Sequence, residues 1–565
     1  MVKVRYIDDY LIQNLFDKNV NILILRFDFY LIKNLYICKN LYIKLKIMAK
    51  KQIKSKAIEV TLWESANKLR GSVEPSEYKH VVLALIFLKF VSDKFEEHRQ
   101  KLIDDGKEKY IEMAVFYNQN NVFFLEENSR WNYIVQKARQ NDIALIIDTA
   151  LHTIEKDNKA LKGALPDNYF SRLGLDTSKL AALISEIDSI DTLKDKQEDV
   201  IGRIYEYFLS KFAIAEGKGK GEFYTPKSIV NLIAEMIEPY KGIIYDPCCG
   251  SGGMFVQSIK FIEAHHGNKK EVSIYGQEYT NTTYKLAKMN LAIRGISANL
   301  GERAANTFSN DLHKDLKADF IMANPPFNQK DWRAENELLH DARWQGYFVP
   351  PKSNANYGWI LNMASKLSDN GIAGFLLANG ALSGGGVEYE IRKQLIEKNI
   401  VEAILILPQN MFYTTNISVT LWILNKNKKA GNRNIGDEVR NYRNRETEIL
   451  FMDLREMGEP FEKKYIQFSE KEIIKIAKTY HTWQTQKIKN IPEYCYSAQK
   501  DEIEKKDYSL VPSKYIEFVN RDENVDFDDK MRTLQSEIKE LLKQEEQSRS
   551  ELKDVFKKLG YQIEK

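Results

Sequence analysis

An Asn-Pro-Pro-Phe segment at residues 324–327 carries the residue types needed to hold a planar amine. Asn324 offers a side-chain carbonyl oxygen and Pro325 a backbone carbonyl oxygen, while the fixed φ angles of Pro325 and Pro326 make the turn rigid. Two acceptors held side by side match the two hydrogens of an exocyclic amino group, and Phe327 provides a face on which a base can stack. Holding those hydrogens draws the nitrogen lone pair out of conjugation, so that it can attack a sulfonium methyl group.

The segment YDPCCGSGGMF (245–255) is a second candidate for chemistry, because it joins a predicted strand to a predicted helix through small residues. Asp246 ends the strand, and the glycines together with Ser251 let the backbone pass close to a ligand. A carboxylate suits a hydroxyl-bearing or cationic ligand better than a pyrophosphate, and the sequence lacks the pattern of a P-loop. The candidate ligand-binding residues of this turn are Asp246, Pro247, Gly250, Ser251, Gly252 and Gly253.

Two further acidic residues follow predicted strands. Glu278 ends the next strand, where a carboxylate can accept hydrogen bonds from both hydroxyls of a ribose. Asp311 follows the third predicted strand and could either accept from an adenine amine or form a turn. Cys248 and Cys249 are adjacent and so poorly placed to chelate one metal, and we interpret them as small packing residues, with no metal site.

The elements that must position these residues alternate between helices and strands from about residue 228 onward. The sequence predicts helices at 227–238, 254–265, 281–294, 357–368 and 388–398, and strands at 242–246, 272–278, near 306, and at 318–323, 372–378, 401–407 and 419–427. Such alternation predicts an α/β fold with a parallel, doubly wound sheet. Ligands of these sheets lie at the carboxyl ends of the strands, which is where the candidate residues fall.

The rest of the chain is predicted to be mainly helical. Apolar residues at three- and four-residue steps predict helices at 132–156 and 178–210, and the tail shows the same spacing, typical of a helix that packs on a partner or on its own chain. The expected domains are a non-native leader or disordered extension at 1–47, a helical N-terminal domain at 48–212, a catalytic domain at 213–430, its extension at 431–528 and a partner-packing helix at 529–565. The leader lacks Ala, Gly, Pro, Ser, Thr, Glu, His and Trp, which favours a start at Met48 over a real amphipathic extension.

Net charge, cysteine content and apolar runs limit the partners and the location that this chain can have. The 565 residues include 83 Lys+Arg and 79 Asp+Glu, so the net charge of +4 is too small to identify a nucleic-acid binder by charge alone. Four cysteines without a disulfide pattern favour a reducing, cytoplasmic location. No apolar run approaches the roughly 20 residues of a membrane helix, so we expect no membrane association.

Taken together, these motifs resemble those of the modification (M) subunits of type I restriction–modification systems, which are adenine-N6 DNA methyltransferases. The resemblance covers about residues 58–520 and includes EFYTP (222–226), DPCCGSGG (246–253), NPPF (324–327) and the segments 62–71, 407–428 and 508–517. It implies a Rossmann-like methyltransferase fold that uses S-adenosyl-L-methionine. The implied cofactor-binding residues are Glu222, Phe223, Tyr224, Thr225 and Pro226, at the methionine end, and Asp246, Pro247, Gly250, Ser251, Gly252, Gly253, Glu278 and Asp311, with Glu278 on the ribose.

The resemblance also implies partners and a target. The target would be an adenine flipped out of double-stranded DNA and held by Asn324 to Phe327, and the complex would contain a specificity (S) subunit, a second M subunit and restriction (R) subunits. Two alternatives stay open: a protein-glutamine methyltransferase, which also presents an amide to an Asn-Pro-Pro turn, and a non-catalytic clamp that wraps DNA. The long loop 328–356 contains Trp332, Trp344, Arg333, Arg343 and Lys352. It is interpreted either as a DNA contact or cover for the flipped base, or as a packed insertion.

Overall fold

The computed structural model describes residue 63 and residues 75–120, 122–190, 206–209, 225–412, 416–461, 465–519 and 527–558. The chain divides into two compact units. The first unit contains the chain up to Tyr224, together with Cys249–Gly252 and Gln277–Ala305, and the second contains Thr225–Cys248, Gly253–Gly276 and Asn306–Lys565. The leader 1–47 and three residues of the EFYTP motif, Glu222, Phe223 and Tyr224, lie outside the described residues.

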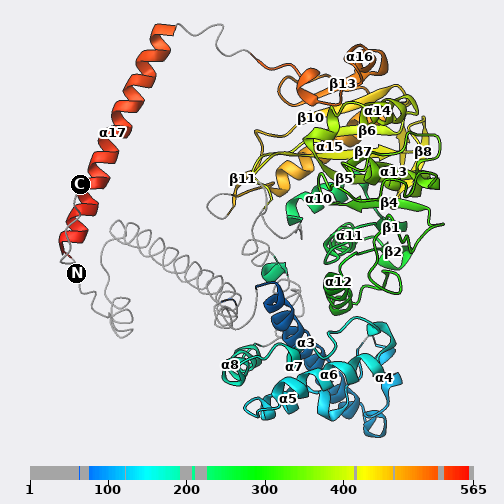
Figure 1. The fold of residues 1–565 in the computed structure, drawn as a ribbon, viewed down its shortest axis with the longest axis vertical. Helices are drawn as coiled ribbons and strands as arrows, with labels where there is room; N and C mark the ends of the chain where they lie inside the picture. The colour runs from blue at the N-terminus through cyan, green and yellow to red at the C-terminus, as the bar shows by residue number, and fades with distance from the viewer. Residues whose placement is uncertain are drawn as a thin grey trace, which may run out of the picture. The chain divides into compact units, whose positions relative to one another are not determined.

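The first unit is built from helices around one apolar core (Figure 1). Its α-helices are α3 (Pro75–Asp104), α4 (Ala114–Asn118), α5 (Trp131–Lys137), α6 (Ile143–Asp157), α7 (Tyr169–Arg172), α8 (Thr177–Asp188) and α12 (Asn281–Ile293), and it also holds the short strand β3 (Ala298–Asn299). The predicted helix 132–156 is wrong as a single element, because the chain turns between α5 and α6. The exposed polar residues Asn141 and Asp142 lie in this turn, where such side chains are favoured. Of the predicted helix 178–210, α8 is described, and residues 191–205 lie outside the described residues.

Helix α12 belongs to the core of this helical unit although the sequence placed it in the α/β region. Leu286, Met289 and Ile293 are buried in the same cluster as the apolar side chains of α3. Lys285 adds a polar contact, because its Nζ donates to the carbonyl oxygen of Leu165 at 2.8 Å. The segment that directly follows Glu278 is therefore held by the N-terminal helices.

The second unit contains a mixed sheet with the strand order β13-β10-β6-β7-β5-β4-β1-β2. These strands are β1 (Gly242–Asp246), β2 (Val272–Gly276), β4 (Ala318–Ala323), β5 (Leu367–Ala378), β6 (Val401–Ile406), β7 (Val419–Asn425), β10 (Glu448–Asp453) and β13 (Cys495–Gln499). The predicted α/β class is confirmed, but the sheet is not wholly parallel. β7 runs antiparallel to both β5 and β6, since no helical crossover separates β6 from β7 in the part of that connection the structure describes.

The predicted strand near residue 306 is also wrong, because the third strand in chain order is β3 and residues 300–317 form turns and loops. Beyond the predicted elements, β10 and β13 extend the main sheet. Small pairs of strands, β8 (Gly431–Ile435) with β9 (Glu438–Tyr442) and β11 (Glu459–Phe461) with β12 (Tyr465–Gln467), lie outside it. Strands β10 and β13 of the predicted extension 431–528 thus continue the sheet of the second unit.

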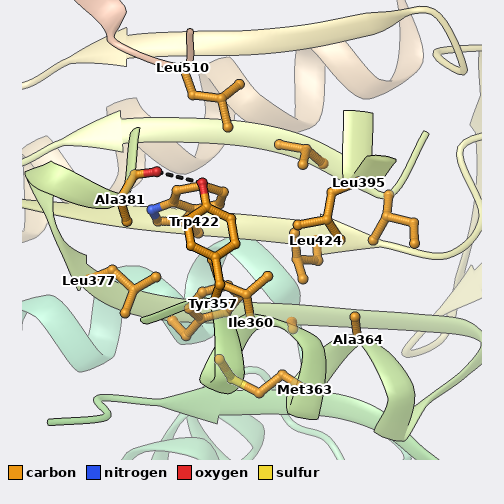
Figure 2. Packing of buried hydrophobic residues seen from close by; sticks show 14 of the residues in the cluster. Tyr357, Ile360, Met363, Ala364, Leu377, Ala381, Leu395, Trp422, Leu424 and Leu510 are labelled. Atoms are coloured by element: carbon orange, nitrogen blue, oxygen red, sulfur yellow. Dashed lines mark hydrogen bonds between the residues drawn. The ribbon is translucent and has the colours of Figure 1, made fainter. Parts of the chain in front are cut away.

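Helices cover both faces of this sheet (Figure 1). They are α10 (Lys227–Ile237), α11 (Gly253–Ala264), α13 (Asn356–Lys366), α14 (Val387–Glu397), α15 (Glu470–Thr485) and the short α16 (Lys500–Lys505). Figure 2 shows Tyr357, Ile360 and Met363 of α13 packed with Leu377 of β5 and Trp422 of β7 in one buried cluster. Side chains alternate between the faces of a strand, so residues of β5 at the other parity face α10.

Gly374 of β5 lets α10 lie unusually close to the sheet. A Cβ atom at this position would stand 2.8 Å from Cγ2 of Ile233 and 3.3 Å from Cγ2 of Ile237, both on α10. The strand needs a residue without a side chain here because any larger one would push the helix away. The C-terminal half of α10 is therefore placed by direct contact with β5.

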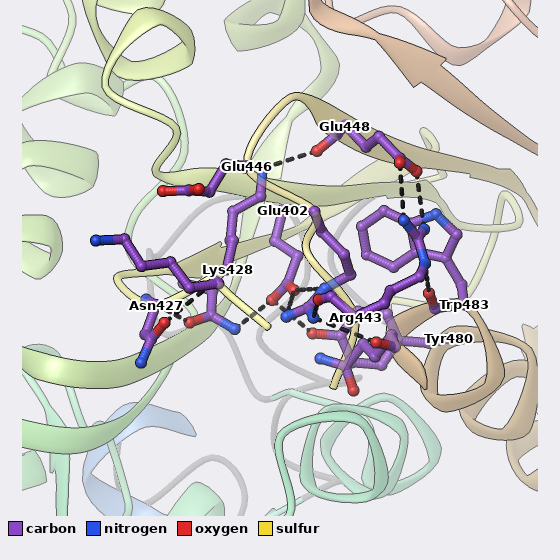
Figure 3. Close-up of polar contacts among 12 residues, drawn as sticks. Glu402, Asn427, Lys428, Arg443, Glu446, Glu448, Tyr480 and Trp483 are labelled. Carbon is purple, nitrogen blue, oxygen red and sulfur yellow. Dashed lines mark hydrogen bonds and ion pairs between the residues drawn. The ribbon is translucent and has the colours of Figure 1, made fainter. Parts of the chain in front are cut away.

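A buried ion network joins β6, β7 and the loop before β10 (Figure 3). The side chains of Glu402 and Arg445 are both 0% exposed and lie 2.8 Å apart, and Asn425 and Tyr480 donate to the second oxygen of Glu402. Lys428 donates to two backbone carbonyls nearby. Burial lowers the pKa of Lys428 to about 8, although the negative charge of Glu402 acts to raise it.

The C-terminal helix α17 (Phe527–Lys558) exposes the apolar residues Met531, Leu534, Ile538, Leu541 and Leu542. Residues 559–565 lie outside the described residues. Among the helices that the structure describes, none is both long enough and apolar enough to span a bilayer.

We expect the stability contributed by Lys428 to rise with pH between about 8 and 10. In this window the folded protein has lost the Lys428 proton, whereas the unfolded chain, with a lysine pKa near 10.4, still binds it. Unfolding then takes up a proton, so raising the pH disfavours it. The difference in unfolding free energy between the wild type and Lys428→Met, measured by urea denaturation, should therefore grow with pH.

Lys429→Met, at the exposed neighbouring residue, is the control for the loss of a lysine. The lowered pKa of Lys428 would be contradicted if the difference in unfolding free energy between the wild type and Lys428→Met stays constant or falls over this pH window.

Candidate active site

The Asn-Pro-Pro-Phe turn leaves the carboxyl end of β4 with its first side chain held on one side. Asn324 Nδ2 donates a hydrogen bond of 3.0 Å to Thr225 Oγ1, the residue before Pro226 and α10. The other end of the same amide, Asn324 Oδ1, is shielded from solvent and has no hydrogen-bond partner among the described residues. Most buried polar atoms in proteins are paired, so this carbonyl is an acceptor that awaits a donor.

A second asparagine clamps the far side of the turn. Asn356, at the start of α13 and 1% exposed, accepts from the backbone N–H of Asn328 at 3.0 Å through its Oδ1 and donates from its Nδ2 to Asn328 Oδ1 at 2.9 Å. Asn328 has a φ of +53°, a left-handed conformation that asparagine tolerates better than most residues. The sequence analysis missed Asn356, because nothing in its local pattern indicates a contact 28 residues away.

Phe327 presents its ring to another aromatic side chain. Its ring centroid lies 6.1 Å from that of Phe412, and the planes meet edge to face at 79°. Phe412 is buried and belongs to the segment 407–428 that carries part of the family resemblance. Edge-to-face contacts are a favoured geometry for aromatic pairs, so Phe412 helps to hold the Phe327 ring in place.

Asp246 lies at the same edge of the sheet as Asn324, since β1 pairs in parallel with β4. The Asp246 residue is 1% exposed, and its Oδ1 accepts from the backbone N–H of Cys248 at 3.0 Å. Thr307 Oγ1 donates to the carbonyl oxygen of Pro247 at 2.5 Å, which ties the start of the turn to the loop before β4. The predicted carboxylate at the end of β1 is therefore in a fixed position.

Within the first unit, Glu278 is bound to the glycine-rich turn. Glu278 Oε2 accepts from the backbone N–H of Gly250 at 3.1 Å, and its Oε1 accepts from the N–H of Thr280 at 2.8 Å. Gly250 and Gly252 have φ angles of +53° and +79°, so the turn uses the left-handed conformations that glycine permits. Asn290 of α12 donates to the carbonyl oxygen of Ser251 at 2.7 Å. The structure thus brings Glu278 and these turn residues together.

The Asp311 carboxylate takes part in a buried ion pair. Its Oδ2 lies 2.6 Å from Lys366 Nζ, the two side chains are 8% and 3% exposed, and its Oδ1 accepts from the N–H of His313. Burial lowers the pKa of Lys366, while Asp311 opposes that shift. Lys366 also donates to the backbone carbonyl of Lys314, so it holds the loop as well as the acid. The sequence analysis missed this lysine.

The interpretation of loop 328–356 as a DNA contact is not supported at its most distinctive residues. Trp332 and Trp344 are 6% and 2% exposed. The guanidinium of Arg343 pairs with Asp341 at 2.7 Å and donates to the carbonyl of Thr307, while Arg333 donates to the carbonyl of Pro350. These cations are engaged with the protein itself. The alternative reading, a packed insertion, fits them better.

Each unit carries part of the donor and acceptor set that a sulfonium nucleoside and an amine require. The second unit offers a fixed carboxylate at Asp246 and an unpaired amide oxygen at Asn324, and the first offers the carboxylate of Glu278 beside a turn of small residues. A cavity of about 420 Å³ in the first unit, lined by side chains such as His80, Arg172 and Lys285, includes none of these residues.

Comparisons with known proteins agree on one family. A model of the N-6 DNA methylase family matches residues 196–524, and a model of the HsdM N-terminal domain matches residues 58–187. The HindI type I restriction enzyme methylase subunit of Haemophilus influenzae is 42% identical over 430 residues, covering 74% of this chain and 93% of that protein. The MjaIX methylase subunit of Methanocaldococcus jannaschii is 35% identical, covering 89% and 91%.

The fold is shared with a solved relative. The type I restriction-modification methyltransferase subunit of Streptococcus thermophilus is 23% identical and gives a TM-score of 0.67, covering 82% of this chain and 100% of that one. The predicted methyltransferase fold with an N-terminal helical region is thereby confirmed.

We expect Lys366→Met to lower the free energy of unfolding by about 3–5 kcal/mol, because it leaves the Asp311 carboxylate buried without its counter-ion. Denaturant titration of the whole chain measures the change. Lys352→Met is a matched control, since Lys352 and Glu335 are also 2.6 Å apart but have side chains 46% and 73% exposed. Equal losses of unfolding free energy in the two variants would contradict the idea that burial sets the cost of removing one partner of the ion pair.

Proposed function

We propose how the residues of this chain transfer a methyl group to DNA. The chain belongs to the N-6 DNA methylase family, among the methylase subunits of type I restriction enzymes. The reaction transfers the methyl group of S-adenosyl-L-methionine to N6 of an adenine in double-stranded DNA. The observation that carries the proposal is Asn324 Oδ1 at the head of a rigid Pro-Pro turn, shielded from solvent and without a hydrogen-bond partner in the part of the chain that the structure describes.

In the proposed mechanism, Asn324 Oδ1 and the carbonyl oxygen of Pro325 accept the two N6 hydrogens of a flipped adenine, and Phe327 stacks on its ring. This geometry turns the nitrogen lone pair toward the methyl donor. The bound cofactor supplies an electrophilic methyl group on a positively charged sulfur. Methyl transfer would form the N–C bond and break the S–C bond, whose electron pair would stay on sulfur. The methylated nitrogen then releases one proton to solvent.

The cofactor-binding residues are proposed on the same basis. Glu278 would accept the ribose hydroxyls, and the turn from Asp246 to Gly253 would line the cofactor, with Thr225 and Pro226 near its methionine end. Glu278 is already fixed by two backbone N–H groups, which supports a preorganised acceptor. Asp311 would face the adenine of the cofactor. Its ion pair with Lys366 restricts how far its carboxylate can turn.

We further propose that the chain works in a cytoplasmic complex with a specificity subunit, a second modification subunit and restriction subunits. The exposed apolar residues of α17, spaced at three and four, support this helix as a surface for one of those chains. The rival clamp function predicts that Asn324 is dispensable. A protein-glutamine methyltransferase has no need of the helical N-terminal region that this chain shares with the family.

Asn324→Ala should abolish methylation of host DNA while complex assembly survives, because it removes the amine acceptor and leaves the fold of the sheet intact. Sequencing that detects N6-methyladenine, combined with size-exclusion chromatography of the complex, measures both. Asn432→Ala, in an exposed strand of the same unit, is the control and should methylate normally. Retained methylation in Asn324→Ala would favour the clamp.

Asp246→Ala should weaken binding of S-adenosyl-L-methionine by roughly 10- to 100-fold, which is the expected loss of a hydrogen bond to a charged group. Isothermal titration calorimetry of the folded variant measures the dissociation constant. Asp437→Ala removes a carboxylate from an exposed turn of the same unit and should leave affinity unchanged. Unaltered affinity in Asp246→Ala would refute its assignment to the cofactor.

A further inference from the structure

We propose that Thr225 is a positioning residue that holds the Asn324 amide in the orientation the reaction needs. The inference rests on the proposed function and adds a role for Thr225 distinct from bordering the cofactor. Its basis is the hydrogen bond of 3.0 Å from Asn324 Nδ2 to Thr225 Oγ1, together with the unpaired Oδ1 on the other end of the same amide.

An asparagine amide is chemically two-sided, because its NH₂ group only donates hydrogen bonds and its oxygen only accepts them. The target amine is itself a donor. With Oδ1 turned to the amine, the pair is donor to acceptor. With the amide rotated by half a turn, Nδ2 would face the amine, two donors would oppose each other, and the adenine would not be held. The reaction therefore depends on which way the Asn324 amide points.

Thr225 stabilises the productive orientation by giving the Asn324 NH₂ group an acceptor. When Oδ1 faces the substrate, Nδ2 faces residue 225, and a side chain without an oxygen there would leave this donor without its acceptor. A lost hydrogen bond of this kind corresponds to roughly a tenfold change in an equilibrium or rate. The lost hydrogen bond would raise the free energy of the productive orientation of the Asn324 amide.

The backbone around Thr225 is suited to this task. Pro226 restricts the residue before it to extended conformations, and α10 begins immediately afterwards at Lys227. Helix α10 is seated on β5 at Gly374, and β5 pairs directly with β4, the strand that ends in Asn324. Donor and acceptor are thus carried by adjacent, packed elements of one unit.

The test compares Thr225→Val with Thr225→Ser in the full complex with its specificity partner. The substrate is a duplex that carries the site found methylated in host DNA. Valine keeps the shape of threonine without its hydroxyl, and serine keeps the hydroxyl. We expect Thr225→Val to lower kcat about tenfold or more at saturating cofactor and DNA. Thr225→Ser should recover most of that loss. Thr149→Val, on an exposed threonine of α6, is the matched control and should behave as the wild type.

Two further measurements separate positioning from other roles. Calorimetry with S-adenosyl-L-methionine measures any change in cofactor affinity, because Thr225 also borders the proposed cofactor site, and the loss of kcat in Thr225→Val should persist once the cofactor is saturating. Duplexes with 2-aminopurine at the target base, which report base flipping by fluorescence and lack an N6 amine, should give a similar signal for both.

The inference would be overturned by an unchanged kcat, by a loss that saturating cofactor restores, by a serine variant as impaired as the valine variant, or by lost flipping. These outcomes differ from failure of the proposed function, in which the wild-type complex itself would not methylate adenine.

Discussion

The central feature of the candidate site is the amide oxygen of Asn324. It is shielded from water and has no hydrogen-bond partner among the described residues. A buried acceptor without a donor costs about 1–3 kcal/mol, so a fold retains one only where surrounding interactions hold it in place. Here those interactions are identifiable. Thr225 engages the opposite end of the amide, two prolines fix the backbone that follows, and Asn356 clamps Asn328 beyond them. These contacts support the proposal that the acceptor is preorganised for a donor supplied by a substrate.

Two packing arrangements support the elements that carry these residues. In the second unit, α10 approaches β5 at Gly374 while α13 covers the opposite face, so Thr225 and Asn356 are held to the same sheet from its two sides. In the first unit, α12 shares the core of the N-terminal helices, and Glu278 stands directly before it. The N-terminal helices therefore hold α12 in place, although α12 lies among the α/β elements in the sequence. The compact units are for this reason not consecutive stretches of the chain.

The parts of the site that the sequence predicts well are those determined locally. β1 was predicted to its last residue, and the ends of β4 and α10 follow from alternation and from proline and glycine. Longer-range features were missed. The antiparallel course of β7 depends on its neighbours in the sheet, and the break between α5 and α6 interrupts a periodic apolar pattern. Arg343 illustrates the same limit. From the sequence, an arginine among tryptophans is as compatible with a DNA contact as with a buried ion pair, and the ion pair with Asp341 is visible only in the structure.

The acceptors proposed for the target amine, Asn324 Oδ1 and the Pro325 carbonyl oxygen, are neutral, and this suits the charge changes of methyl transfer. The attacking nitrogen gains positive charge as its lone pair is consumed, and carbonyl dipoles aimed at its hydrogens stabilise that charge. An amide or a backbone carbonyl does so without competing for the proton at neutral pH, whereas a free carboxylate would carry its own desolvation cost into the site. Asp311 is matched by Lys366 in a pair with no net charge. Positioning by neutral dipoles, rather than by an acid or a base, is therefore what this arrangement of side chains is equipped to supply.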